Sequence, residues 1–128
     1  MSAAARSILV YSIYVLGLGA TLLFIPNVPL SIVGLPTTTE VWIHVAGMTV
    51  FFLGIIYFLA ARNESHTTFV ASVPIRLSVP VIFGIFAATG LTSWNILLLT
   101  PLDIVFALWT WGALQRASMM ASRAGARA

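Results

Sequence analysis

Four long apolar runs divide the sequence, and each is long enough to cross a membrane as a helix. They cover residues 7–25, 41–61, 69–91 and 94–115. A helix needs about 20 apolar residues to span about 30 Å of hydrocarbon, because each residue advances it by about 1.5 Å. The runs are continuous, without the alternation of a strand or the stripe of an amphipathic helix. The pattern predicts an all-α fold, a four-transmembrane-helix bundle that forms a single integral membrane domain over residues 1–128.

Composition favours the same environment. Apolar residues make up 60% of the chain and charged residues only 7%, against about 25% in an ordinary soluble domain. So few charged side chains cannot cover the surface of a water-soluble monomer. Cysteine is absent, which excludes thiol chemistry and disulfides. Amphipathic rings prefer the membrane interfaces, where we expect the side chains of Trp42, Trp94, Trp111, Tyr11 and Tyr57.

The arginines predict the orientation of the helices, because basic segments tend to stay in the cytoplasm. All six fall on one side of the predicted bundle, and residues 26–40 and 92–93 on the other side contain none. We therefore expect an N-in, C-in, multi-pass protein of the inner (cytoplasmic) membrane. The net charge of +3 is scattered over helix ends, so it indicates attraction to anionic lipid and no nucleic-acid partner.

Prolines predict where the helices break. Residues 26–36 are expected to lie on the membrane surface, as one short helical turn. In the third run Pro74 fits the first position of a helix, and Pro80 predicts a kink because proline lacks the N–H of a helical hydrogen bond. The fourth run has two interpretations. We favour a helix from Trp94 with a kink at Pro101 over a helix that begins at Pro101.

The most informative single residue is Asp103. In a helix from Trp94 it lies about 13 Å along the axis, near the middle of the membrane. An ionisable side chain at that depth is costly and is expected to face the bundle interior and a partner. Arg76 is expected about one and a half turns closer to the cytoplasmic side, a gap that its long side chain nearly closes, and Thr110 shares the helix face of Asp103. We hypothesise one buried polar network of Arg76 and Asp103, which is either a ligand or proton site or a structural ion pair or helix-start aspartate.

A second set of residues predicts a pocket near the outer interface. His44 lies one turn into the second run, and the expected lining is completed by Trp42, Trp94 and Asn95. The alternative interpretation is a packing face, because small and aromatic residues occupy the same stripe of that helix: Gly47, Phe51, Gly54 and Phe58. A metal site is not expected. The only two histidines, His44 and His66, are 22 positions and about 33 Å apart along the chain.

Several local patterns resemble the DoxX-like group of small bacterial four-helix membrane proteins. They are the prolines that end the first run (Pro26, Pro29), the glycines and Ala60-Ala61-Arg62 of the second, Arg76 in the third, and Asn95, Pro101-Leu102-Asp103 and Ala113-Leu114-Gln115-Arg116 in the fourth. The resemblance covers most of the chain and implies a helical bundle. Some members of that group look like accessory subunits of quinol-linked respiratory complexes, so it also implies membrane partners. It transfers no catalytic residue.

Two functions remain compatible with the sequence. The first is a non-enzymatic accessory or interaction subunit, whose partners are membrane lipids, other membrane-protein subunits or further copies of the chain. The alternative is a small binder or carrier of an apolar or quinone-like molecule, which would use the intramembrane pocket of Asp103, Arg76 and His44. No group of residues supplies a nucleophile, a base and an orienting partner together, so an enzyme is less expected, and no cofactor is.

Overall fold

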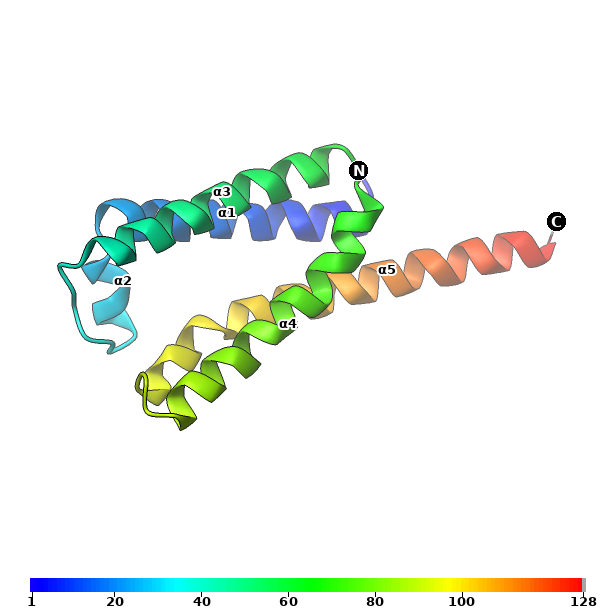
Figure 1. Ribbon diagram of the computed structural model, residues 1–128. Helices are drawn as coiled ribbons and strands as arrows, with labels where there is room; N and C mark the ends of the chain where they lie inside the picture. Colours follow the sequence, from blue (N-terminus) through cyan, green and yellow to red (C-terminus); the bar gives the residue numbers. More distant parts are fainter. Residues whose placement is uncertain (128) are drawn as a thin grey trace.

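The computed structural model describes the backbone of residues 1–127 and the side chains of residues 1–125, and within that range every regular element is a helix (Figure 1). The order is α1 (Ala3–Phe24), α2 (Asn27–Ile32), α3 (Val41–Arg62), α4 (His66–Ala88), a short 3-10 helix η1 (Trp94–Leu99) and α5 (Pro101–Arg127). The prediction of an all-α fold is confirmed.

Four helical segments are long and apolar enough to cross a membrane. These are α1, α3, α4 and the continuous stretch from η1 into α5, each with a mean hydropathy of 1.7 or more. Large apolar side chains cover the outside of the bundle, among them Ile13, Phe52 and Leu59, which are each more than half exposed. An apolar surface this extensive is stable against lipid and not against water. The chain is thus a multi-pass helical membrane protein.

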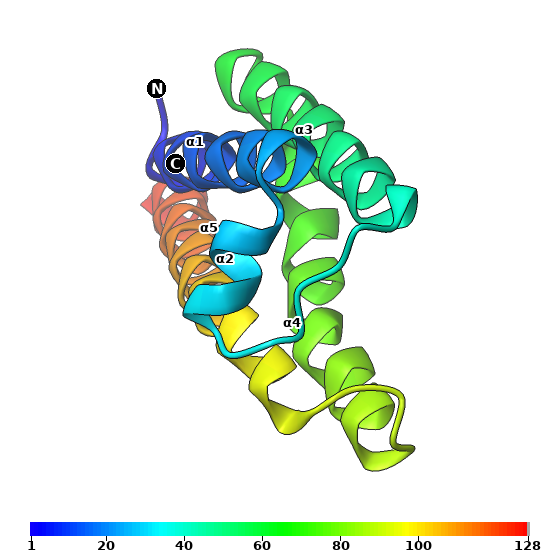
Figure 2. The same ribbon diagram turned by 90° about the vertical axis from the view of Figure 1, so that its left-hand side faces the viewer.

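The four long helices form two pairs that diverge toward one end. α1 packs against α3 along most of its length, and α4 packs against α5 (Figures 1 and 2). α1 also contacts α5, whereas α3 and α4 touch little beyond the turn that joins them. The pairs are widest apart at the end where α2 and η1 lie, and the N-terminus and the end of α5 lie at the opposite end.

Glycines allow α1 and α3 to approach closely. A Cβ placed on Gly19 would lie 2.6 Å from Cα of Phe51, and one on Gly47 would lie 2.6 Å from the carbonyl carbon of Leu22. A Cβ on Gly54 would meet the side chain of Leu16 at 2.8 Å. Residues later in α3 contact residues earlier in α1, so the two helices are antiparallel. Three residues of the predicted packing stripe of α3, Gly47, Phe51 and Gly54, thus lie in this contact.

The turn between α3 and α4 holds the N-terminus of the chain. Glu64 has a positive φ of 50°, and the N–H of Ser65 closes the end of α3 on the carbonyl of Ala60 at 3.0 Å. The Glu64 carboxylate accepts hydrogen bonds from the backbone N of Ser2 at 2.8 Å and from its Oγ at 2.7 Å. These two hydrogen bonds lower the pKa of the Glu64 carboxyl below its usual value.

Several expected helix boundaries differ from the structure. α1 begins at Ala3 rather than residue 7, and α4 ends at Ala88 rather than residue 91. α4 begins at His66 rather than residue 69, so Pro74 lies inside the helix with Pro80 and is not its first residue. The helix changes direction along its length, as Figure 1 shows. α5 continues to Arg127 instead of ending near residue 115, because its last turns consist mainly of good helix formers. Sequence hydropathy marks where a helix leaves the membrane and not where it ends.

The fourth crossing combines both of its expected forms. Residues Trp94–Leu99 form a 3-10 helix, and the α-helix itself begins at Pro101. Thr100 connects them: its N–H and its Oγ1 both bond to the carbonyl of Leu97, and its carbonyl accepts the N–H of Ile104 at 3.1 Å. The segment is therefore helical from Trp94 with a break at the proline. Residues 26–36 contain the short helix α2, as expected.

Candidate functional site

The guanidinium of Arg76 lies inside the bundle, where only 1% of the residue is exposed. Its Nη2 donates to Thr110 Oγ1 at 2.9 Å and to Ser72 Oγ at 3.0 Å, and its Nε donates to the Ser72 carbonyl at 3.3 Å. Ser72 and Arg76 are four residues apart, so they share one face of α4. Thr110 comes from α5, and Arg76 therefore links these two helices.

One nitrogen of this guanidinium makes no hydrogen bond to the described residues. Arg76 Nη1 is buried and has no hydrogen-bond partner among the described residues. An unsatisfied buried donor costs about 1–3 kcal/mol, and more when it belongs to a charged group. Native interiors contain few such groups, and each calls for a physical explanation. An acceptor brought by another molecule would remove this cost.

Tyr11 connects Arg76 to Asp103. The Arg76 Cζ lies 4.6 Å from the centre of the Tyr11 ring, a cation–π arrangement. The Tyr11 hydroxyl donates to Asp103 Oδ1 at 2.6 Å. Asp103 is in the first turn of α5, where the helix dipole favours a carboxylate. The two charged residues thus belong to one cluster, with the tyrosine from α1 between them.

Hydroxyl and aromatic groups surround this cluster. Thr110 Oγ1 lies 2.7 Å from Ser7 Oγ and 3.0 Å from the carbonyl of Phe106, in addition to its bond with Arg76. The ring of Tyr11 packs at 5.5 Å from both Tyr57 and Phe106 and at 6.1 Å from Tyr14. The polar atoms are therefore enclosed by rings on several sides, which lowers the local dielectric constant and strengthens their interactions.

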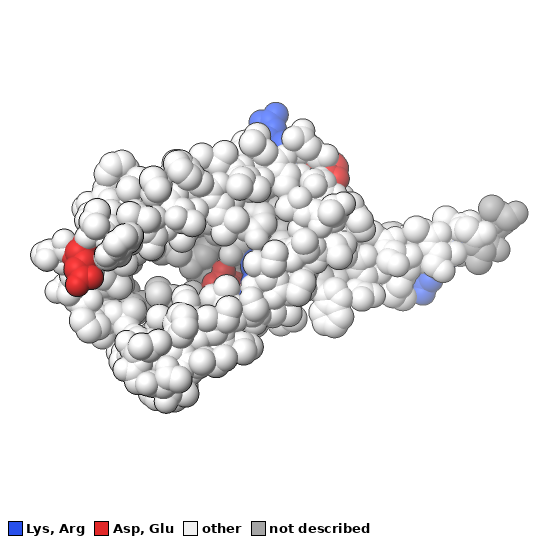
Figure 3. Space-filling model, viewed as in Figure 1, with Lys and Arg blue, Asp and Glu red and all other residues white. Residues whose placement is uncertain are grey.

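A hollow lies between the two helix pairs. Figure 3 shows this opening from the side, with acidic and basic atoms visible inside it. It opens between α3 and α4, which diverge in Figure 1, while α1 and α5 contact each other behind it. Asp103 is half-buried.

The residues of the expected outer pocket do not join this cluster. His44 Nδ1 donates to the carbonyl of Leu23 at 2.6 Å, and the ring borders a shallow pocket at the end of α1. Trp42 and Trp94 are 71% and 61% exposed. Asn95 Nδ2 donates to the Gly34 carbonyl at 3.2 Å, which ties η1 to the loop after α2.

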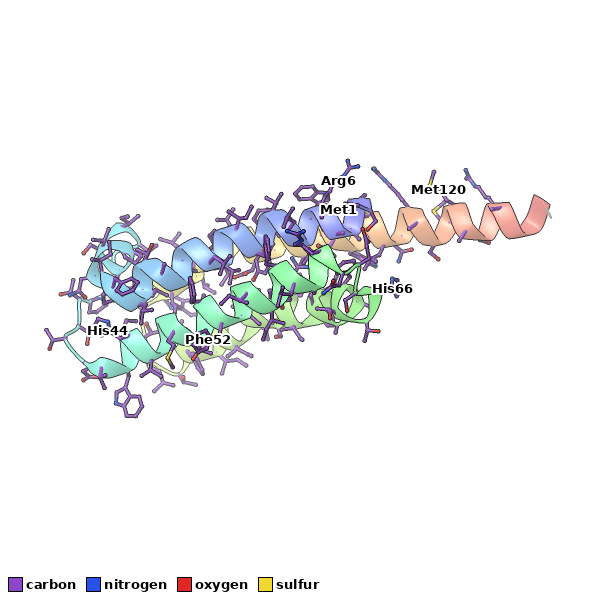
Figure 4. All side chains as sticks on the ribbon, turned by 90° about the horizontal axis from the view of Figure 1, so that it is seen from above. Met1, Arg6, His44, Phe52, His66 and Met120 are labelled. Carbon is purple, nitrogen blue, oxygen red and sulfur yellow. The ribbon has the colours of Figure 1, made fainter. Side chains whose placement is uncertain are left out.

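α1 is the reason for this separation. It lies between α3 and α5, the helices that carry His44 and Asp103. His44 and His66 lie toward opposite ends of the bundle (Figure 4). Among the described residues, no group of three or more His, Cys, Asp or Glu side chains is placed to hold a metal ion.

Sequence reasoning missed the residue at the centre of the cluster. Tyr11 and Tyr57 were expected near the membrane interfaces, but they are 5% and 4% exposed and lie in the core. Ser7 and Ser72 were not singled out either. The spacing of polar residues could have identified them. Ser7 precedes Tyr11 by four residues and Ser72 precedes Arg76 by four, which places each pair on one helix face.

Comparison with protein-family models, with curated proteins and with solved structures finds no match to this chain.

Proposed function

We propose that this protein binds a small apolar or quinone-like molecule in the hollow between its helix pairs, with the polar end of that molecule at Arg76, Tyr11 and Asp103. The observation that carries the proposal is the buried Nη1 of Arg76, a charged donor without an acceptor among the described residues. Binding would satisfy this donor, whereas a purely structural arginine would be expected to have all its donors paired.

The position of the hollow indicates how such a molecule would reach the site. The opening between α3 and α4 faces sideways, toward the lipid of a surrounding membrane (Figure 3). An apolar molecule dissolved in the bilayer can move through it without crossing water. The surrounding aromatic rings would contact its apolar part, as is common in small-molecule sites.

Binding can be measured on the purified chain in lipid nanodiscs, with a short-tailed quinone as the probe. Trp109 stacks on Phe106 next to the cluster, so its fluorescence should fall when the probe binds. Tyr11→Phe and Asp103→Asn should weaken this quenching, whereas Tyr14→Phe should not, because it keeps the aromatic ring and removes a hydroxyl that has no hydrogen bond among the described residues. Equal quenching in all four chains, or none in the native one, would refute the proposal.

For the orientation we propose both termini in the cytoplasm and a location in the inner membrane. The arginine distribution supports this arrangement. A fluorescent or enzymatic tag that is active only in the cytoplasm should be active when fused to either end. Activity of tags fused after residue 92 instead would contradict it.

A second function, an accessory subunit of a membrane complex, is supported by the last part of α5. After Gln115 this helix extends beyond the rest of the bundle, and its described side chains are exposed (Figure 4). A helical arm of this kind can contact another protein, and the resemblance to the DoxX-like group agrees with such a role. Native mass spectrometry of protein gently extracted from its own membrane should then show a defined complex. A lone monomer would argue against this second function.

A further inference from the structure

We infer that a cleft between the start of α4 and the middle of α5 binds one phospholipid whose headgroup carries a net negative charge. The cleft has a volume of about 440 Å³. His66, which lines it, lies at the end of the bundle from which α5 extends (Figure 4). The lining contains no residue of the Arg76 cluster, so this inference does not depend on the proposed function.

The lining of the cleft changes from polar to apolar along the helix axes. Its polar end consists of His66, Gln115 and Ser118, which lie at or beyond the ends of the apolar runs 69–91 and 94–115. Its remaining lining is apolar and lies inside those runs: Val70, Val73, Pro74, Trp111 and Leu114. From His66 to Pro74 the cleft follows about 12 Å of α4. A lipid of a bilayer has the same order of groups, so its headgroup fits at His66 and an acyl chain fits toward Pro74.

Arg116 supplies a positive charge beside the polar end. It follows Gln115 in α5 and lines an adjoining cleft together with His66, which is common to both clefts. A guanidinium donates paired N–H groups in a geometry that matches phosphate oxygens. Arg116 is exposed, so its side chain can turn toward a phosphate at the polar end.

The start of α4 adds to this preference for an anion. Its first turn contains no acidic residue, and Ser65 at the N-cap makes no side-chain hydrogen bond to the backbone. The partial positive charge of the helix start is therefore not neutralised within the helix. Glu64 lines the adjoining cleft, but its carboxylate already accepts two hydrogen bonds from Ser2. A phosphatidylglycerol should thus bind more tightly than a phosphatidylcholine, whose ammonium group is repelled by Arg116.

The inference can be tested by native mass spectrometry of the full chain, released from nanodiscs with equal amounts of phosphatidylglycerol and phosphatidylcholine of the same acyl chains. The native chain should retain one phosphatidylglycerol, in excess over phosphatidylcholine. Arg116→Gln should lower this excess by about fivefold, the size expected for one arginine beside an anionic lipid. Arg123→Gln is the matched control, because it removes the same charge from the same face of α5 but lines neither cleft. It should leave the excess unchanged.

The apolar end of the cleft has its own pair of variants. Val70 and Ile75 are 49% and 55% exposed on α4, and of the two Val70 lines the cleft. Val70→Trp should fill the space of the acyl chain and reduce the retained phosphatidylglycerol to the level of phosphatidylcholine. Ile75→Trp adds the same bulk outside the cleft and should retain the native excess.

Three results would overturn the inference. The first is equal retention of the two lipids by the native chain. The second is an equal loss in Arg116→Gln and Arg123→Gln, which would indicate a general attraction to the basic part of α5. The third is displacement of the lipid by glycerol phosphate added to the solution, since the cleft would then bind a soluble phosphate ester. None of these results bears on the hollow, whose probe is a quinone.

Discussion

The contact between α1 and α3 allows a direct test with two alanine substitutions in the same helix. Gly19 and Gly17 are two residues apart in α1. A Cβ on Gly19 would lie 2.6 Å from Cα of Phe51, whereas a Cβ on Gly17 would meet nothing within 4 Å. Carbon atoms pack best at about 3.5–4.0 Å, so Gly19→Ala must push the helices apart by about 1 Å.

Two contributions to the free energy of unfolding act in opposite directions. Crowding of a packed interface costs about 1–3 kcal/mol. Replacement of glycine by alanine within a helix contributes about 1 kcal/mol in the stabilising direction. Gly17→Ala should therefore be neutral or slightly more stable than the native chain. Gly19→Ala should be less stable than Gly17→Ala by about 1–3 kcal/mol, because both share the same gain in helix propensity.

The assay is reversible unfolding in mixed micelles of a mild detergent and sodium dodecyl sulfate, followed by circular dichroism. The midpoint of Gly19→Ala should shift to lower denaturant fraction and that of Gly17→Ala should not. If both variants unfold at the same midpoint, α1 and α3 are not in close contact at Gly19. The packing described here would then be wrong.

Three further predictions concern the polar residues, and each is checked by the same unfolding assay. Thr110→Val removes an acceptor from the buried guanidinium and should cost about 1–3 kcal/mol, while Thr49→Val on the exposed side of α3 should change stability by less than about 0.5 kcal/mol. Tyr11→Phe leaves the Asp103 carboxylate without its hydroxyl donor and should cost about 1.5–3 kcal/mol; an unchanged midpoint would contradict this hydrogen bond. Because the pKa of Glu64 is lowered in the folded chain, its contribution is complete above the usual pKa of 4.5 and is lost as the pH falls through the folded-state value. The native chain should therefore lose stability on acidification below about pH 4.5 relative to Glu64→Gln, and parallel pH profiles would refute the contact with the N-terminus.

Hydropathy alone predicted the four crossings, because a span of lipid imposes a length and an apolar composition that no other fold requires. The packing stripe with Gly47 and Gly54 was also predictable, since small residues spaced along one helix face allow close approach. Arg76 and Asp103 were expected in one polar network, with Thr110 on the helix face of Asp103, and the structure does bring the three into one cluster.

The order of helices around the bundle was not predictable from the chain. The expected pocket required α3 and α5 to be neighbours, whereas α1 lies between them. Nothing in an apolar run indicates which neighbour it faces, because lipid and protein interior favour the same side chains. For the same reason Tyr11 was expected at an interface, although its ring lies in the core and its hydroxyl is bonded to Asp103. Its role depends on a contact across 92 positions of sequence.

The close packing of α1 against α3 determines which helices beside the hollow can move. Backbones held together at Gly19 and Gly47 cannot slide or separate without losing many contacts at once, so this pair acts as a stiff wall. α4 and α5 contact that wall over a smaller area and are joined to it through the short turn at Glu64. Regions with fewer packed contacts open at lower free energy. The width of the hollow is therefore set by the position of α4 and α5 relative to α1 and α3.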